Sequence, residues 1–368
     1  MRIPVALYPY CSQLLPIVKT FEELQSKYAL KRLISPPGFG LIGKDAGYAS
    51  NQITVGMNVD SDCDFSTPEW EVLFVIKTVG SESISDELLE NVIKKAIQSN
   101  KSVAMFDNEC SSIPEYIRIL QNIYPDKIET HMGNLQKPVS CDNADRSTYY
   151  HFNVPVILVG GLVEEADTLE VLLHLASEFR KSGTFPSVIT NSPLADIFGF
   201  HNITPIFQKH DLTESQKISE LNFILHGIQD DERPDVILME APDAVIRYND
   251  FALNGFGIHS YMLCQAIDPD YFICCVPCEL AVGNFLDALS ADFTYRLGCP
   301  IHAAHVSNLI IDSLNLIQTH QISYIHADLK TVRQQIMNQS KGSSIPLFNV
   351  VDDQGEALYQ YLCEIMTI

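Results

Sequence analysis

The sequence predicts an α/β protein of two domains, each built on a doubly wound, mostly parallel sheet. Apolar runs of strand length alternate with amphipathic stretches of helix length along the whole chain. The 368 residues, 46% of them apolar, suffice for two hydrophobic cores. One polar segment without such a pattern, Gly133–Tyr149, interrupts the alternation. We therefore expect one domain over residues 1–140 and a second over residues 150–368.

The N-terminal domain is expected to be Rossmann-like. Helical patterns run from about Leu14 to Lys27 and from Asp86 to Gln98. Around them lie apolar runs typical of buried strands, with the sequences IPVALY, ALKRLIS, VLFVIK and SVAMF. Buried strands separated by helices indicate a parallel sheet with helices covering its faces.

The alternation begins again at Val154 and continues to Ile368. The expected strands read VPVILVG, SVIT, PDVILME, YFICCV, CPIHAAHVSN and ISYI, followed by one last strand. The expected helices cover Thr168–Lys181, Glu214–Gln229, about Gly257–Ala266, Leu280–Leu297, Leu329–Gln339 and the C-terminus. Hydrophobic strands separated by helices predict a sheet that is covered on both faces.

Composition excludes several classes of partner. Lys and Arg total 24 against 46 Asp and Glu, which gives a formal charge of −22 and opposes attraction to nucleic acid or anionic lipid. Neither an export signal nor an apolar stretch of about 18 residues is evident, so we expect a cytoplasmic protein without a membrane span. In that compartment the ten cysteines are expected to be reduced, and most of them to be small buried hydrophobic residues.

The turn after VPVILVG has the layout of a degenerate phosphate-binding P-loop. That loop requires G-x-x-x-x-G-K-[ST] between a buried strand and a helix. Here Gly161, preceded by Gly160, matches the first glycine and Thr168 matches the hydroxyl, whereas Asp167 replaces the lysine and alanine replaces the second glycine. A carboxylate in place of the cation would repel a phosphate by several kcal/mol, on the order expected at low dielectric. ATP and magnesium are therefore disfavoured as ligands. The alternative is an ordinary strand-to-helix turn, with Asp167 or Thr168 capping the helix.

Polar residues end other strands of the same expected sheet. Glu240 ends PDVILME, where a Walker B strand carries the carboxylate that orients metal-bound water. His305, Ser307 and Asn308 end the segment CPIHAAHVSN, and Cys278 follows YFICCV. The carboxyl ends of parallel strands meet at one edge of a sheet, so we expect these residues to share a site with Gly161 and Thr168.

A glycine-rich loop follows the strand ALKRLIS. Gly38, Gly40 and Gly43 have the spacing of a dinucleotide-binding motif, but they follow the second strand and no helical pattern comes after them, which excludes an NAD site. Lys44 and Asp45 are expected to be exposed polar groups on this loop. Contact with a ligand or partner and a purely structural loop both remain open.

The pair Cys275 and Cys278 offers a weak candidate for a metal site. A single C-x-x-C needs further ligands to hold zinc, and Cys299, His302 and His305 follow downstream. The alternative, which we favour, is a turn at the end of a strand with buried thiols.

Several phrases together resemble a known family. LYPYCSQLLPIV, SPPGFGLIGKDAGYA, GGLVEEADT, IFGFHNITPIF and CVPCELAVGNF are similar to phrases in the peptide maturation system proteins, which accompany Cys-rich ribosomal peptides and radical SAM maturases in clostridia. This resemblance implies a role in making a modified peptide, with the precursor peptide or the maturase as partner. The C-terminal half also resembles the dethiobiotin synthetase-like P-loop proteins.

Three functions are compatible with these observations. The first is an accessory pseudo-NTPase scaffold that binds a precursor peptide or a maturase. The second is an ATP- and magnesium-dependent ligase or transferase that uses Thr168 and Glu240 at magnesium and Lys44 or another distant lysine at phosphate. The third is a metal- or sulfur-handling protein that uses Cys275 and Cys278.

Overall fold

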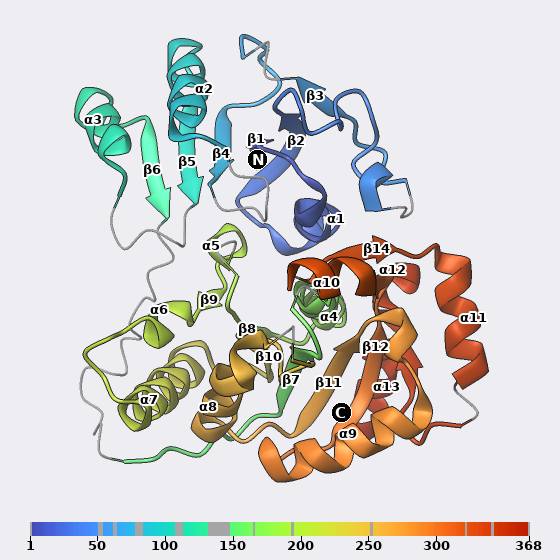
Figure 1. The fold of residues 1–368 in the computed structure, drawn as a ribbon. Helices are drawn as coiled ribbons and strands as arrows, with labels where there is room; N and C mark the ends of the chain where they lie inside the picture. The colour runs from blue at the N-terminus through green and yellow to red at the C-terminus, as the bar shows by residue number, and fades with distance from the viewer. Residues whose placement is uncertain are drawn as a thin grey trace. The chain divides into compact units, whose positions relative to one another are not determined.

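The chain folds into two compact α/β units, each with a mostly parallel sheet, as the sequence predicts (Figure 1). The computed structural model describes residues 2–50, 54–61, 65–77, 84–106, 113–131, 148–164, 166–192, 195–250, 253–320, 322–339 and 342–366. Unit 1 comprises Met1–Asn134 and Ser192–Gly199, and unit 2 comprises Leu135–Asn191 and Phe200–Ile368. Most of the segment in which we placed the domain boundary lies outside the described residues.

Unit 1 is built on a six-stranded parallel sheet. Its strands are β1 (Ile3–Tyr8), β2 (Tyr28–Ser35), β3 (Val59–Ser61), β4 (Val72–Ile76), β5 (Ser102–Phe106) and β6 (Ile128–His131). They lie in the order β3-β2-β1-β4-β5-β6, which is the doubly wound order of the Rossmann fold. The helices of this unit are η1 (Ser12–Leu14), α1 (Leu15–Leu24), η2 (Tyr48–Ser50), α2 (Asp86–Gln98), α3 (Glu115–Ile123) and α5 (Ala195–Phe198).

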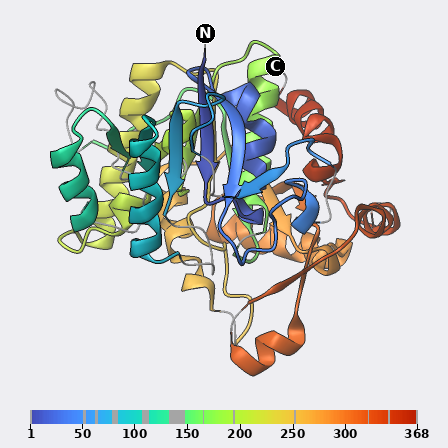
Figure 2. The ribbon, with the colours of Figure 1, turned by 90° about the horizontal axis from the view of Figure 1, so that it is seen from above.

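Alternation along β4 shows how the two faces of this sheet are covered. Leu73 and Val75 pack with α2 and α3 in one core, whereas the ring of Phe74 lies 6.3 Å from that of Phe21 on α1. Successive side chains of a strand point to opposite faces, so α1 covers the face opposite to α2 and α3 (Figure 2).

Unit 2 is built on a seven-stranded sheet in the order β15-β12-β11-β7-β10-β8-β9, in which every neighbouring pair is parallel. Its strands are β7 (Val156–Gly161), β8 (Pro186–Thr190), β9 (His201–Asn202), β10 (Val236–Glu240), β11 (Tyr271–Val276), β12 (Ile301–Val306) and β15 (Leu347–Phe348). Its helices are α4 (Thr168–Lys181), α6 (Thr204–Phe207), α7 (Glu214–Glu232), η4 (Asn254–Gly257), α8 (Ile258–Ala266), η5 (Cys278–Leu280), α9 (Gly283–Arg296), α10 (Ser313–Thr319), α11 (Leu329–Gln339), α12 (Val350–Asp353) and α13 (Glu356–Met366).

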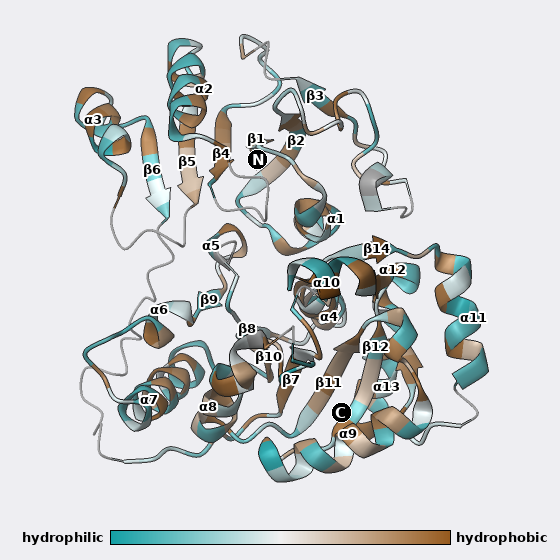
Figure 3. Cartoon of the chain, in the orientation of Figure 1, coloured by the Kyte–Doolittle hydropathy of each residue, from teal (hydrophilic) through white to brown (hydrophobic). Residues whose placement is uncertain are grey.

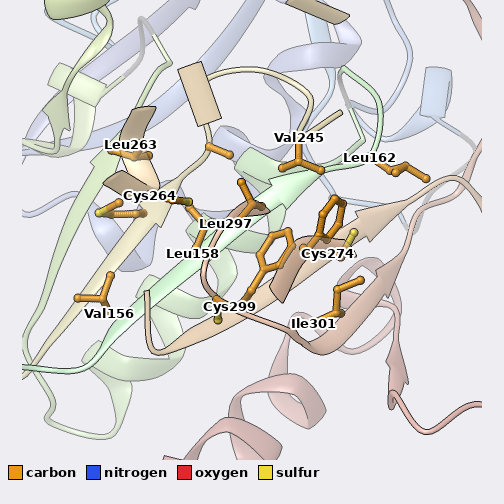
Figure 4. Packing of buried hydrophobic residues seen from close by; sticks show 14 of the residues in the cluster. Val156, Leu158, Leu162, Val245, Leu263, Cys264, Cys274, Leu297, Cys299 and Ile301 are labelled. Atoms are coloured by element: carbon orange, nitrogen blue, oxygen red, sulfur yellow. The ribbon is translucent and has the colours of Figure 1, made fainter. Parts of the chain in front are cut away.

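Helices cover both faces of this sheet, which is why its strands are uninterrupted apolar runs (Figure 3). On one face α4 packs against β7, β8 and β10, and α13 packs against α4. On the other face α7, α8 and α9 close a large core with side chains such as Leu158, Leu263 and Cys274 (Figure 4). Cys264, Cys274 and Cys299 lie in this core, as expected for cysteines that act as small hydrophobic residues.

One strand prediction needs correction. ISYI does not join the main sheet: β14 (Tyr324–His326) pairs antiparallel with β13 (Leu309–Ile311) in a separate hairpin that carries α10 between its strands (Figure 2). Ile325 and His326 are exposed, so this segment lacks the two-sided burial of a central strand.

No helix in the described parts of the chain is long and apolar enough to cross a membrane.

Candidate functional site

The turn in which the sequence predicts an altered P-loop joins β7 to α4 and folds tightly back on itself. A Cβ atom on Gly161 would lie 2.6 Å from the backbone oxygen of Val163, and one on Gly160 would lie 2.7 Å from the side chain of Val245. The backbone N–H of Leu162 donates to the backbone oxygen of Cys275 on β11 at 2.8 Å. Both glycines are therefore required by close packing, whether or not a phosphate ever approaches this turn.

Thr168 and Glu240 meet as the P-loop layout predicts. Strand β10 lies directly beside β7, and the Thr168 hydroxyl donates to Glu240 Oε1 at 2.8 Å. The Thr190 hydroxyl and the backbone N–H of Asn191, at 3.3 Å, donate to the other carboxylate oxygen. Burial raises the pKa of Glu240, and these three hydrogen bonds act in the opposite direction. Sequence reasoning missed Thr190, although a polar residue that ends the short strand SVIT was a usable signal.

Asp167 is turned away from the loop toward the end of β12. Its carboxylate accepts hydrogen bonds from the Ser307 hydroxyl at 2.5 Å and from Nε2 of His305 at 3.3 Å. His305 is fully buried, and its Nδ1 accepts the backbone N–H of Val350 at 3.3 Å, which places the ring proton on Nε2. Asp167 stands at the N-cap position of α4 with φ 61°, but its side chain makes no capping hydrogen bond. The capping role considered for Asp167 is therefore wrong.

Asn308 has a structural role beside this cluster. Its side-chain oxygen accepts a hydrogen bond from the side-chain amide of Asn349 at 2.8 Å, and its own amide donates to the backbone oxygen of Ala327. Asn349, which the sequence did not single out, caps α12 and also donates to the backbone oxygen of Val306 at 2.7 Å. These bonds hold the end of β12 against α12 and so fix His305 and Ser307 in position.

The cysteine and histidine residues do not assemble into a metal site. Cys299 and His302 lie 3.9 Å apart at the amino end of β12, whereas Cys275 and Cys278 lie at the carboxyl end of β11, the opposite edge of the same parallel sheet. Burial raises the pKa of the Cys275 thiol well above its ordinary value, and Cys274, Asp167 and Glu240 raise it further. Within the described residues no group of three or more His, Cys, Asp or Glu side chains is arranged to hold a metal. The proposed completion of a metal set by Cys299 and His302 is therefore wrong.

The edge of the sheet around the loop is rich in acids. Burial and the nearby Asp243 raise the pKa of Glu164, and Nδ1 of His259 lies 2.8 Å from Asp243. That hydrogen bond to Asp243 raises the pKa of His259. Among the ion pairs of the described residues, none joins a Lys or Arg side chain to Asp167, Glu240 or Glu164.

The glycine-rich loop of unit 1 is an internally bonded structure. Gly38, Gly40 and Gly43 have φ values of 108°, 69° and 77°, in the left-handed region that favours glycine. The Asp45 carboxylate accepts the backbone N–H groups of three residues of its own loop, at 2.7 to 3.0 Å. Burial alone would raise the pKa of Asp45, but these bonds together lower it. Nζ of Lys44 lies 3.9 Å from the ring centroid of Tyr48.

Lys44 and Asp45, which we expected to be exposed polar groups, are only partly exposed. Asp45 holds its own loop together, and Lys44 packs on a neighbouring ring. These contacts favour the structural interpretation of the loop over ligand binding. A Cβ atom on any of the three glycines would meet nothing within 4 Å, so close packing does not require glycine here. Their positive φ values do.

We expect Asp167→Ala to lower the free energy of unfolding by about 2–3 kcal/mol. The change removes the acceptor of two buried donors and places alanine in a left-handed conformation, which costs about 1 kcal/mol by itself. Asp167→Asn is the matched control, because asparagine tolerates that conformation and keeps one acceptor oxygen, so the loss should be about 1 kcal/mol. Urea unfolding of the three proteins measures the difference. Equal stability of all three would contradict the anchoring role of Asp167.

Comparison with known proteins supports the fold alone. A solved structure described as a DUF1611 family protein from Anabaena variabilis superposes with a TM-score of 0.62 and 12% sequence identity, over 99% of this chain and 100% of that one. No protein-family model matches the chain, and no curated protein matches it. The α/β architecture with two domains is therefore shared with a known structure.

Proposed function

We propose that this chain is an accessory protein in the maturation of a ribosomally synthesised peptide, and that unit 2 is a pseudo-NTPase scaffold that binds the peptide or its maturase. The observation that carries the proposal is the anchoring of Asp167 by Ser307 and His305. An acid has replaced the P-loop lysine, and two buried side chains hold it in place. The loop thus carries an acid, and no lysine, at the sequence position from which a nucleotide-binding loop supplies its cation.

Charge decides between binding and rejecting a triphosphate. Two unit negative charges about 4 Å apart repel each other by about 4 kcal/mol at an effective dielectric of 20. A γ-phosphate near Asp167 would meet this repulsion, and Glu164 adds a further negative charge once it is ionised. The ordinary lysine would instead attract the phosphate, so the replacement removes a favourable interaction and adds an unfavourable one.

The resemblance to peptide maturation system proteins supports the peptide or the maturase as partner. A scaffold role requires neither nucleotide turnover nor an ordered metal. The acidic chain, with a formal charge of −22, would favour a neutral or basic partner segment.

Mg-ATP should give no heat in isothermal titration calorimetry at millimolar nucleotide. It should also leave the melting temperature unchanged, because a ligand that does not bind the folded state cannot stabilise it. Mg-GTP and Mg-ADP serve as controls for base and phosphate number. A saturable heat with a rise in melting temperature would contradict the pseudo-NTPase proposal.

Binding to the partner is the direct test. Residues 1–368, immobilised at one end, should retain a Cys-rich ribosomal precursor peptide or a radical SAM maturase. An unrelated acidic protein of similar charge controls for electrostatic adsorption. Failure to retain either partner would refute the scaffold role.

A second candidate is an ATP- and magnesium-dependent ligase or transferase. The hydrogen bond from Thr168 to Glu240 favours it, because it preserves the hydroxyl and carboxylate that orient magnesium in P-loop enzymes. This candidate requires a cation from elsewhere to replace the lysine. Peptide-dependent release of ADP or AMP that is lost in Thr168→Ala would support it over the scaffold.

A further inference from the structure

A groove of about 350 Å³ lies in unit 2 between η5, strand β13 and helix α11. Its volume is at the lower end of the range for ligand sites. Helix α11 is mostly hydrophilic, in contrast to the apolar strands of the sheet (Figure 3). The side chains that line the groove include Cys278, Glu279, Ile310, Thr331, Gln334 and Asn338.

The helical wall of the groove presents a row of amide side chains. Gln334 and Asn338 are four residues apart on α11, so they lie on one face with a separation of about 6 Å along the axis. In an extended peptide, groups on the same edge recur every second residue, about 6.6–6.8 Å apart. An amide side chain carries both a donor and an acceptor, so each can bond a peptide N–H and C=O. The row therefore matches the main chain of an extended segment.

The opposite wall supplies a fixed carboxylate. Glu279 Oε1 accepts the backbone N–H of Ile311 at 2.8 Å, which holds the side chain beside the groove. The lining contains this acid and no Lys or Arg side chain among the residues that the structure describes. Gln335 donates to the backbone oxygen of Ala281 at 3.2 Å and so ties α11 to the segment after η5. The walls are held in place, and their charge suits a neutral or basic occupant.

Cys278 lines the groove but is not equipped for thiol exchange. The residue is 4% exposed, and burial together with Glu279 raises the pKa of its thiol. The thiolate is the reactive form, so a raised pKa suppresses nucleophilic attack. The groove is thus suited to binding a segment without forming a covalent bond to it.

We propose that this groove binds an extended, neutral-to-basic peptide segment through its main-chain amides, with Gln334 and Asn338 as the recognition pair and Glu279 as the determinant for a basic side chain. The inference rests on the proposed function and gives it a location. The groove also adjoins the altered P-loop through the β13–β14 hairpin, because the Tyr324 hydroxyl donates to the backbone oxygen of Glu164. A bound peptide would therefore contact the hairpin that is bonded to that loop.

Fluorescence anisotropy of the full-length protein tests the groove. The probe is a fluorescein-labelled synthetic peptide of alternating threonine and lysine residues, which favours an extended conformation, carries positive charge and contains no cysteine. The double variant Gln334→Ala/Asn338→Ala should bind it about tenfold more weakly, as expected for the loss of two hydrogen bonds. Glu279→Gln keeps the acceptor for Ile311 and should weaken binding about threefold, with a reduced dependence on salt. Met337→Ala is the control, because Met337 is 73% exposed on the same helix and outside the groove lining.

Hydrogen exchange gives a second measurement that needs no variant. Bound peptide should slow exchange in residues 329–339 and in β13. If the wild type binds the probe and the double variant binds it equally well, the groove is refuted while the proposed function stands. If neither protein binds the probe, the inference fails, whereas the proposed function is decided separately by the retention of a precursor or a maturase. The proposal would also be overturned if the wild type bound a neutral oligosaccharide instead of the peptide and the double variant lost that binding.

Discussion

Glu240→Ala should lower the free energy of unfolding by about 3 kcal/mol at pH 6. The variant leaves the hydroxyls of Thr168 and Thr190 without their acceptor in a buried site and opens a cavity. For a unit of this size the melting temperature should fall by about 10 °C. Differential scanning calorimetry measures this change on the full-length protein.

Glu240→Gln is the matched control for shape. Glutamine keeps one acceptor oxygen in the same place, so the loss at pH 6 should stay within about 1 kcal/mol. If both variants lost a similar free energy of unfolding, the negative charge of Glu240, and not its acceptor oxygens, would stabilise the site. That result would contradict our interpretation that burial disfavours the carboxylate form.

The comparison of Glu240→Gln with wild type should also depend on pH. The folded-state pKa of Glu240 is raised above its ordinary value of 4.5, so the folded protein binds this proton more tightly than the unfolded chain does. The stabilisation from that proton is complete below the unfolded pKa and is lost as the pH rises through the folded pKa. Glutamine cannot lose a proton, so Glu240→Gln should gain stability relative to wild type as the pH rises from 4.5. A constant difference across pH 4–8 would contradict the raised pKa.

Gly161→Ala should destabilise unit 2 by about 3 kcal/mol. The added Cβ atom would lie 2.6 Å from the backbone oxygen of Val163, and a backbone atom cannot rotate away as a flexible side chain can. The loop would have to shift and would weaken the hydrogen bond from Leu162 to Cys275. Urea unfolding followed by far-ultraviolet circular dichroism measures the loss.

Gly342→Ala provides the control for this glycine. The nearest atom that its Cβ would meet, the backbone oxygen of Gln339, lies 3.8 Å away, which is an ordinary contact. We expect a change within about 0.5 kcal/mol. If Gly161→Ala were as stable as Gly342→Ala, the close contact between Gly161 and the backbone of Val163 would be contradicted.

The strands and helices could be predicted from the sequence because their signals are local. Thr168–Lys181, Asp86–Gln98 and Leu329–Gln339 have the expected bounds, since apolar periodicity and the residues at their ends specify them without distant contacts. The hairpin at Tyr324–His326 was assigned to the wrong sheet, because a short apolar run does not reveal its partner strand. The choice depends on burial of both faces, which only the folded chain has.

The candidate site was predictable in part for a similar reason. The carboxyl ends of parallel strands converge, and this rule correctly placed Thr168 beside Glu240. The direction in which a side chain turns does not follow from that rule. Asp167 was expected at the helix cap or opposite a phosphate, and the structure directs it to His305 and Ser307 instead.

The sequence by itself determined the α/β class, the two sheets and the acid that stands where the P-loop pattern has lysine, because local pattern or residue identity specifies each of them. Tertiary structure alone decided which side chains meet. It bound Asp167 to the end of β12, enclosed Glu240 among hydroxyls, separated Cys299 from Cys278 and placed the amides of α11 opposite Glu279. The reason is physical: hydrogen bonding and desolvation depend on distances between residues far apart in the chain, and those distances exist only after the strands have paired.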